Sequence, residues 1–364
     1  MIRHSLTFLA MAWFFASCTE ERIDPGSLAV SGPNVVGETT YVRLNPEWVG
    51  FNKPRDIVVG NEPFLYVADT DNDRIIMLDQ AGRVLGISLT IKRPIAIAQD
   101  KRLQLLVCAE FDTLLPGRSV PTTFGAVFRL DLVSVGHLIS LATPQRVYYD
   151  DEDSTRRYTG VATLYDNSYY VTRVGPKNEQ SVVDKDNSIL LFSKSDVLIT
   201  PVTQTFSHDG TGLLSIHRPT GIATLPNSRS VEYVFSQIEV SAATVPLYKV
   251  QWIRLVTEGQ TTNYVSKFYP SVNGDIGMLE IEKFTRPEGV ALDPSGNLFV
   301  VDAAKDSLYI FNTRGVEQFS FGGTGSGEKQ FREPSGVSFY DKTVYVADAG
   351  NNRVVRFKLS TDLR

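Results

Sequence analysis

Charged side chains recur at two positions of a repeated pattern, and they are the first candidates for chemistry. Short apolar runs end in a charged residue at four places, namely Asp69, Arg173, Asp302 and Asp348. The residue after the proline that begins the pattern is charged in two copies, as Arg55 and Glu288. A few charged groups that converge on one pocket can hold a peptide, a glycan or a cation. We therefore predict that these six residues bind a ligand.

The aspartates also have a purely structural interpretation. Asp69 is followed by Asn72 and Arg74, and Asp348 is followed by Asn351 and Arg353. Short polar side chains at the end of a strand fasten the next turn by accepting hydrogen bonds from nearby backbone groups. Both interpretations stay open from the sequence.

Other catalytic and metal-binding signatures are missing from the sequence. There is no Gly-x-Ser-x-Gly motif, which marks the nucleophile of many serine hydrolases. The four histidines do not show a known zinc-ligand spacing. We therefore predict no metal, no cofactor and no assigned catalytic residue, and we favour a protein that is not an enzyme.

A repeated unit positions these residues. Each copy has a Pro-x-Gly-like start, a β run, a turn, a second β run that often ends in Asp, another turn and a third run. Alternating β-branched and aromatic residues between turn clusters indicate strands. The anchors of the six copies are Pro54, Pro94, Thr159, Pro219, Pro287 and Pro334.

This unit resembles the NHL repeat, most clearly in the first, fifth and sixth copies. The resemblance implies an all-β fold, a six-bladed β-propeller over residues 39–364 in which each blade has four strands. The last copy ends after its third strand, so residues 40–44 are predicted to supply its outer strand. That pairing would join both ends of the chain and cover an exposed edge.

The repeat also predicts where the charged residues lie. Asp302, Asp348 and Asp69 belong to consecutive blades and are expected to form an acidic wall at the channel mouth, with Arg173 roughly opposite. The longest segments are expected to gather on one face: residues 110–124, 174–187 and 238–245 between second and third strands, and residues 143–158, 207–218 and 270–286 between blades. One-sided elaboration favours a selected binding surface, although insertions also drift in where nothing contacts them.

The first residues resemble the leader of a bacterial lipoprotein. Residues 1–17 combine a short basic start with an apolar run that is too short to span a bilayer. Small residues precede Cys18, the expected site of lipidation, and residues 18–38 are predicted to be a tether. By resemblance to lipoprotein sorting rules, the residues after Cys18 favour the outer membrane. A plain secretory signal is the alternative.

Composition and charge limit the partners. The chain has 36 basic and 41 acidic residues, and this net charge of −5 argues against a nucleic-acid-binding protein. We predict an envelope-anchored binding module for a protein, peptide or glycan, held at the membrane only by the lipid on Cys18, as a monomer or as a subunit of an envelope complex. The alternatives are a propeller enzyme, a lyase or lactonase-type hydrolase with a cation site built partly from Glu288 and Asp302, and a purely architectural subunit.

Overall fold

The computed structural model describes residues 39–177, 184–202, 204–205, 216–238, 248–269 and 276–363. The chain from Thr40 onward is one compact unit. The predicted leader and tether, including Cys18, lie outside the described residues, so both stay predictions.

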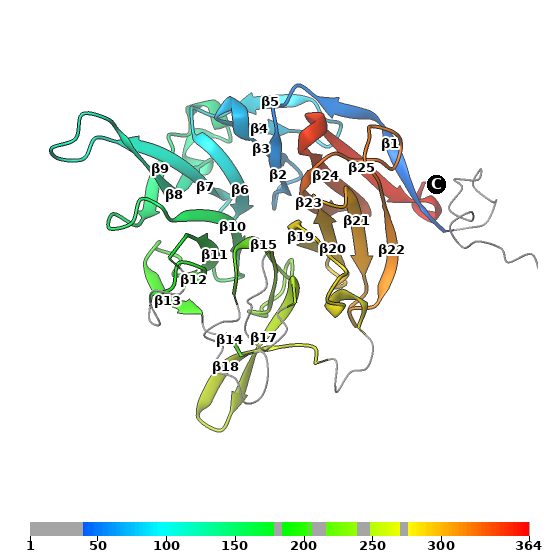
Figure 1. Ribbon diagram of the computed structural model, residues 1–364. Helices are drawn as coiled ribbons and strands as arrows, with labels where there is room; N and C mark the ends of the chain where they lie inside the picture. The colour runs from blue at the N-terminus through cyan, green and yellow to red at the C-terminus, as the bar shows by residue number, and fades with distance from the viewer. Residues whose placement is uncertain are drawn as a thin grey trace, which may run out of the picture. The chain divides into compact units, whose positions relative to one another are not determined.

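The strands form six sheets around a central axis, which confirms the predicted six-bladed propeller (Figure 1). Neighbouring strands within each blade are antiparallel. Blades 1 to 3 consist of β2 (Pro54–Val59), β3 (Leu65–Asp69), β4 (Arg74–Leu78), β5 (Val84–Ile87); β6 (Lys92–Gln99), β7 (Gln104–Thr113), β8 (Thr122–Asp131), β9 (Gln145–Tyr149); and β10 (Arg157–Thr163), β11 (Tyr169–Val174), β12 (Ser188–Phe192), β13 (Leu198–Val202).

Blades 4 to 6 follow the same order from the axis outward. They consist of β15 (Pro219–Thr224), β16 (Tyr233–Gln237), β17 (Val250–Glu258), β18 (Thr261–Ser266); β19 (Pro287–Leu292), β20 (Leu298–Asp302), β21 (Ser307–Phe311), β22 (Glu317–Gly322); and β23 (Pro334–Tyr340), β24 (Thr343–Asp348), β25 (Arg353–Leu359), β1 (Tyr41–Val49). A short strand, β14 (Gln204–Thr205), adds a fifth, parallel strand to blade 4.

The last blade takes its outer strand from the beginning of the chain, as the sequence predicts. Tyr41 pairs with Leu359 and Val49 with Arg353 in an antiparallel ladder between β1 and β25. The described chain ends therefore meet in one sheet, and the ring closes on itself.

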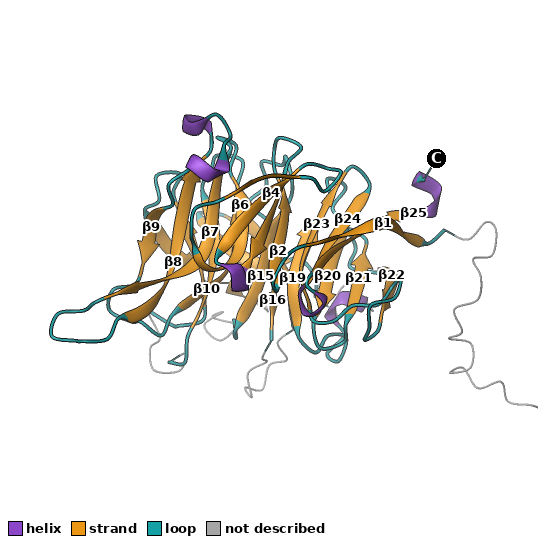
Figure 2. Cartoon of the chain, turned by 90° about the horizontal axis from the view of Figure 1, so that it is seen from above, coloured by secondary structure: helices purple, strands orange, loops and turns teal. Residues whose placement is uncertain are grey.

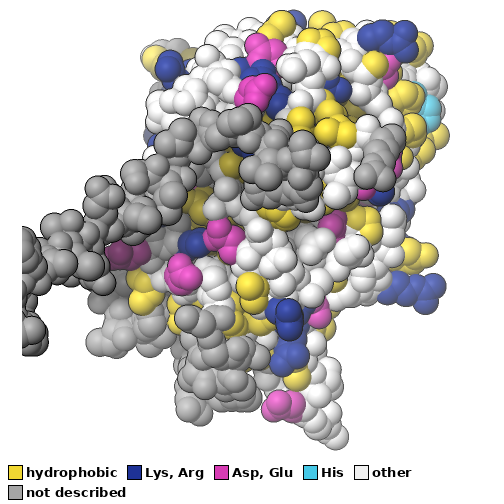
Figure 3. All heavy atoms as spheres, turned by 90° about the vertical axis from the view of Figure 1, so that its right-hand side faces the viewer, with side chains coloured by type: hydrophobic (Ala, Val, Ile, Leu, Met, Phe, Trp, Pro, Cys, Tyr) yellow, Lys and Arg dark blue, Asp and Glu magenta, His cyan; other side chains and the backbone are white. Residues whose placement is uncertain are grey.

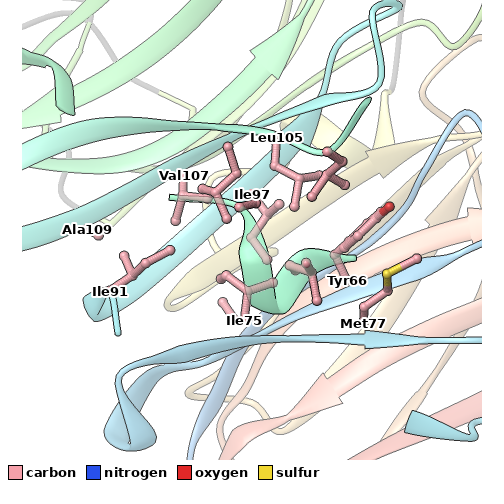
Figure 4. Packing of buried hydrophobic residues seen from close by; sticks show 13 residues of the cluster. Tyr66, Ile75, Met77, Ile91, Ile97, Leu105, Val107 and Ala109 are labelled. Carbon is pink, nitrogen blue, oxygen red and sulfur yellow. The ribbon is translucent and has the colours of Figure 1, made fainter. Parts of the chain in front are cut away.

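The core is divided among the six interfaces between neighbouring blades. Each of six clusters of buried apolar side chains combines residues of two adjacent blades. Between blades 1 and 2, for example, Tyr66, Ile75 and Met77 pack against Leu105 and Val107 (Figure 4). This division explains why the second strands, such as β3, β16, β20 and β24, are buried on both faces: each blade is covered on both sides.

Strand direction sorts the loops onto two faces (Figure 2). Loops between second and third strands, and those between blades, open on one face, whereas first-to-second and third-to-fourth turns open on the other. Part of the predicted loop 143–158 is the outer strand β9, and much of 110–124 extends β7 and β8. Residues 132–144 form a long loop with two short 3-10 helices on the second face, a feature that the repeat pattern does not predict.

The outer surface of the propeller carries both charged and apolar side chains, for example Leu85 on β5 and Ile199 on β13. On the side that carries blades 5 and 6, acidic and basic side chains are interspersed (Figure 3). In the described segments, none of the helices has the length and apolarity needed to cross a membrane.

Candidate functional site

A cavity of about 560 Å³ lies on the axis, lined by the first strand of every blade. It has two ends. The loop-side mouth, where the first strands begin, is lined by Arg55, Ile95, Thr159, Thr220, Glu288 and Ser335. The turn-side mouth, where these strands end, is lined by Asn61, Lys101, Tyr165 and Asn227.

A β-bulge turns one side chain of each first strand toward the loop-side mouth. In blade 1, Pro54 pairs with Asp69 but Asp56 pairs with Ala68, so Arg55 has no opposite residue. The same shift in register occurs at Thr159, Thr220, Glu288 and Ser335, and the irregular stretch of blade 2 includes Ile95. Bulges re-aim side chains in this way beside many binding sites.

The glycine of the Pro-x-Gly pattern is required by the close approach of neighbouring first strands. A Cβ atom at Gly336 would lie 2.7 Å from the Cα atom of Asp56 and 2.9 Å from the carbonyl oxygen of Arg55. Four blades therefore have glycine at this position, blade 2 has Ala96, and blade 1 has Asp56.

Two of the predicted residues meet at the loop-side mouth. The Nη2 atom of Arg55 donates to Oε2 of Glu288 at 3.0 Å, across blade 6. Arg286 lies on the other carboxylate oxygen, with its Nε atom 3.4 Å from Oε1. The side chain of Glu288 is 12% exposed and that of Arg55 is 39% exposed, so the pair is accessible from the mouth.

Hydroxyl groups occupy the equivalent position in three other blades and join each blade to the next. Thr159 donates to the carbonyl oxygen of Pro219 at 2.7 Å, and Thr220 donates to that of Pro287 at 2.6 Å. Ser335 donates to the carbonyl oxygen of Pro54 at 3.0 Å. These bonds hold the ring of first strands together and add neutral polar groups to the wall of the mouth.

Asp56 is a further carboxylate in the channel lining, and it is not among the six residues predicted from the sequence. Its Oδ1 accepts from the backbone N–H of Ile57 and its Oδ2 from that of Ile97, both at 2.8 Å. Desolvation by burial raises the pKa of Asp56 to about 6, although these two N–H donors and Arg55 lower it. A carboxyl group with such a pKa exchanges its proton near neutral pH.

One signal in the sequence marks Asp56. It occupies the glycine position of the pattern, in Pro54-Arg55-Asp56, where four other copies have glycine. A charged residue at a position that packs against neighbouring backbone is unexpected, and such a break in a repeat indicates a functional exception.

The three aspartates at the ends of second strands do not join Arg55 and Glu288 in the channel lining. Asp69 accepts from the backbone N–H of Asn52 at 2.6 Å and from the Arg74 side chain at 2.7 Å. Asp348 is held in the same way by the backbone N–H of Arg332 and by Arg353, both at 2.7 Å.

Asp302 accepts four backbone N–H groups, which belong to Thr285, Arg286, Ala304 and Lys305. All three aspartates are fully buried. Each one ties the loop that enters its blade to the turn that follows, which is the arrangement that the structural interpretation describes.

Arg173 is also buried and directed into its own blade. It donates to Oδ1 of Asp184 at 2.6 Å and to the carbonyl oxygens of Lys185 at 2.5 Å and Asp186 at 3.2 Å. The structure therefore brings together only Arg55 and Glu288 of the six predicted residues. A binding role for the other four residues stays a prediction, and these four do not line the central cavity.

The described residues do not fit the divalent-cation site of the enzyme alternative. No three His, Cys, Asp or Glu side chains within these segments are close enough to hold a metal ion. The carboxylate of Asp302 accepts hydrogen bonds from backbone N–H groups, and that of Glu288 forms ion pairs with two arginines. We therefore derive no chemistry through a metal at this mouth.

Comparison with known proteins supports the fold alone. No family model matches the chain, and no curated protein matches it in sequence. The NHL resemblance therefore stays a prediction from the sequence.

Solved structures do resemble the chain over most of its length. A gluconolactonase from Xanthomonas campestris has a TM-score of 0.53 at 11% identity, covering 89% of this chain and 98% of that one. A PQQ-bound aldose sugar dehydrogenase from Streptomyces coelicolor has a TM-score of 0.55 at 12% identity, with coverages of 89% and 99%. A luciferin-regenerating enzyme has a TM-score of 0.58 at 11% identity, with coverages of 88% and 95%. The chain thus shares the propeller fold of these proteins.

Proposed function

We propose that the chain is an enzyme that hydrolyses a small, hydroxylated ester or lactone at the loop-side mouth. This is the enzyme alternative of the sequence analysis, without its cation site. The observation that carries the proposal is the position of Asp56, a carboxylate that lines the channel next to Arg55. Desolvation raises its pKa to about 6, which makes it a stronger base than an ordinary aspartate. The similarity in fold to a gluconolactonase and to a luciferin-regenerating enzyme supports an enzyme over a binding module.

The residues at this mouth suit such a reaction. Asp56 takes a proton from a water molecule as the water attacks the substrate carbonyl carbon, and it returns the proton to the departing alkoxide oxygen. Arg55 is partly exposed and offers N–H donors to the oxyanion that forms. Glu288 and the hydroxyls of Thr159 and Thr220 can bind substrate hydroxyl groups, which are both donors and acceptors.

The test is hydrolysis of a panel of sugar lactones and short hydroxy esters, followed by acid release. We expect Asp56→Asn to lower kcat/KM by about 100-fold or more, the usual contribution of a general base. The wild-type rate should rise with pH to a plateau, with its midpoint near 6, because only the ionised carboxylate accepts a proton.

Asp341→Asn is the matched control, because Asp341 lines the same cavity at its other end. It should leave kcat/KM within about twofold of wild type, as expected for a carboxylate that does not touch the reaction. Equal losses in the two variants, or a panel without any turnover, would contradict the hydrolase proposal.

The binding-module prediction keeps one specific observation in its favour, the hairpin of β7 and β8. It projects beyond blade 2 (Figure 1) and carries two exposed apolar side chains at its tip, Leu114 and Val120. Arg146 stacks on Phe111 with its guanidinium 3.9 Å from the ring centre, which stiffens the hairpin. Such an exposed apolar tip suits contact with a protein partner.

This second candidate is tested by crosslinking in envelope fractions. A Leu114→Asp, Val120→Asp variant should lose a crosslinked partner that the wild type retains. Val197→Asp, at an equally exposed apolar residue in the β12–β13 turn, should retain it. A partner that survives both changes would show that the hairpin tip is not the binding surface.

We also propose that the chain is an outer-membrane lipoprotein anchored through Cys18. The support is the leader pattern of residues 1–18 in the sequence. Growth with labelled palmitate should label the wild type and not Cys18→Ser. Label on both proteins, or on neither, would contradict lipidation at this cysteine.

A further inference from the structure

The turn-side mouth has an arrangement of polar groups that the proposed function does not use. Its residues come from the turns between first and second strands of several blades, and Asn61, Lys101, Tyr165 and Asn227 all line the cavity. Lys101 belongs to blade 2, Asn61 to blade 1, and Asn227 to blade 4.

The Lys101 ammonium spans this mouth. Its Nζ atom donates to Oδ1 of Asn61 at 2.6 Å and to Oδ1 of Asn227 at 2.7 Å. Blades 1 and 4 stand opposite each other in a ring of six, so one nitrogen atom joins opposite walls of the channel. An ammonium has three donors, and these two bonds leave one for a further acceptor.

The groups around Lys101 are fixed by other hydrogen bonds. Asn61 donates from Nδ2 to the carbonyl oxygen of Asp100 at 3.0 Å, which orients its Oδ1 toward the lysine. The backbone N–H of Asn61 is held by Gln99 at 2.6 Å. The backbone N–H of Lys101 donates to Oδ1 of Asn167 in blade 3 at 2.8 Å. The position of the ammonium is therefore set before any ligand arrives.

One carboxylate, that of Asp341, also lines this end of the cavity, but it is not paired with the cations here. No described Asp or Glu forms an ion pair with Lys101 or with Arg229, which follows Asn227 by two residues in the chain. The Arg229 guanidinium is 5.3 Å from the centre of the Tyr165 ring, and Tyr165 is 49% exposed. Partial desolvation lowers the pKa of Lys101, which is the signature of a cation that lacks an opposite charge.

We propose that the turn-side mouth binds an oxyanion, the carboxylate or phosphate group of a small organic ligand. The Lys101 ammonium donates its remaining N–H to the anion, Arg229 supplies a second positive charge, and the exposed Tyr165 ring offers a flat surface to the organic part. A charge-assisted hydrogen bond of this kind is among the strongest that proteins form. The site is independent of Asp56 and of the hydrolysis proposed above.

The experiment is calorimetric titration of the full protein with sodium phosphate and with sodium malonate, at low ionic strength so that the charges are not screened. We expect wild type to bind at least one of the two anions at a single site. Lys101→Met should weaken that binding by about tenfold or more, because it removes the charged donor. Lys101→Arg keeps the charge and should retain most of the affinity.

Lys305→Met is the matched control. Lys305 also donates to two oxygen atoms, the backbone carbonyls of Glu282 and Lys283 at 3.0 and 2.8 Å, but it lies away from the cavity. It should bind the anions as wild type does. Equal weakening in the two methionine variants would overturn the proposal, because it would show general attraction to net charge.

A second measurement does not depend on any variant. The bound anion should slow acetylation of Lys101 by acetic anhydride several-fold, as followed by peptide mass spectrometry, and should leave Lys305 unaffected. Binding of malonate alone indicates a carboxylate ligand and binding of phosphate alone a phosphoester. Failure of both anions to bind wild type, or an unchanged rate at Lys101, would overturn the site.

Discussion

The two mouths of one channel are built from the same strands but treat charge in opposite ways. At the loop-side mouth Arg55 and Glu288 neutralise each other across blade 6, and Asp56 lies in the wall beside them. At the turn-side mouth Lys101 is held by neutral amides of Asn61 and Asn227.

This difference follows from the local backbone at each end. In every first strand the residue at the loop-side mouth lies in a bulge and has no opposite residue on the second strand. Its side chain is therefore not constrained by strand pairing, and charged, hydroxyl and apolar residues occupy this position in different blades. The turn-side residues are in tight turns, where asparagine is favoured because it tolerates left-handed backbone; Asn167 and Asn227 have φ values of 69° and 56°. One mouth therefore pairs opposite charges directly, whereas the other holds the Lys101 ammonium between two side-chain amides.

The largest effect on stability is expected from the carboxylate of Asp56 at the loop-side mouth. The pKa of Asp56 is raised from 3.8 to about 6, so the folded protein binds this proton more tightly than the unfolded chain does. The resulting stabilisation is complete below about pH 4 and is lost as pH rises through 6; its upper limit is about 3 kcal/mol. Urea unfolding of wild type and Asp56→Asn from pH 4 to 7 should show their difference changing in this window. A difference that is constant with pH would contradict the burial of a titrating group here.

The next effect tests the neutral part of the loop-side mouth. Thr220→Val removes hydrogen bonds of 2.6 Å to the carbonyl oxygen of Pro287 and of 2.9 Å to the Ser236 hydroxyl. We expect a loss of about 1–2 kcal/mol in the free energy of unfolding, because the carbonyl group is left without its partner. Thr200→Val, on the exposed outer strand β13, is the control and should change stability by less than about 0.5 kcal/mol. Similar losses in both would show that the inner ring has no special role.

A smaller effect is expected for the ion pair. Arg55→Gln should cost less than about 1 kcal/mol, since the arginine is partly exposed and Glu288 keeps Arg286 as a second partner. The difference from wild type in urea unfolding should shrink further in 1 M NaCl. A large loss that resists salt would mean that Glu288 depends on Arg55 alone.

The smallest effect is expected at the other mouth. Lys101→Met should leave the free energy of unfolding within about 0.5 kcal/mol of wild type, because lost hydrogen bonds are offset by removal of a partly desolvated charge. The free energy of unfolding would then respond to changes at the loop-side mouth and not to Lys101→Met, whereas anion binding would depend on Lys101. A destabilisation as large as that of Thr220→Val would make Lys101 a structural clamp.

The repeat in the sequence was sufficient for the architecture. The spacing of Pro54, Pro287 and Pro334 and the alternating runs after them predict the strands, because the pattern of a strand and its turns is local in sequence. The last copy has no fourth strand after Leu359, and this unpaired sheet edge predicts the pairing with Tyr41 at the other end of the chain. The pattern also located Arg55 and Glu288 correctly at one mouth.

Only the closed ring of blades shows which side chains line each mouth of the channel. Asp69 and Asp348 look equivalent to Glu288 as candidate ligands in the sequence, yet their carboxylates are used on backbone N–H groups within their own blades. Asp56 was overlooked because a single residue does not reveal that a carboxylate has been buried beside a channel.

Sequence alone therefore determined the strands, their order and the closure of the ring, since each depends on near neighbours or on the unpaired edge of one sheet. Tertiary structure alone brought Arg55 to Glu288 and Lys101 to Asn227, which are far apart in the chain. Those contacts depend on the number of blades in the ring and on how far each side chain reaches across the axis. A local sequence pattern encodes neither of these.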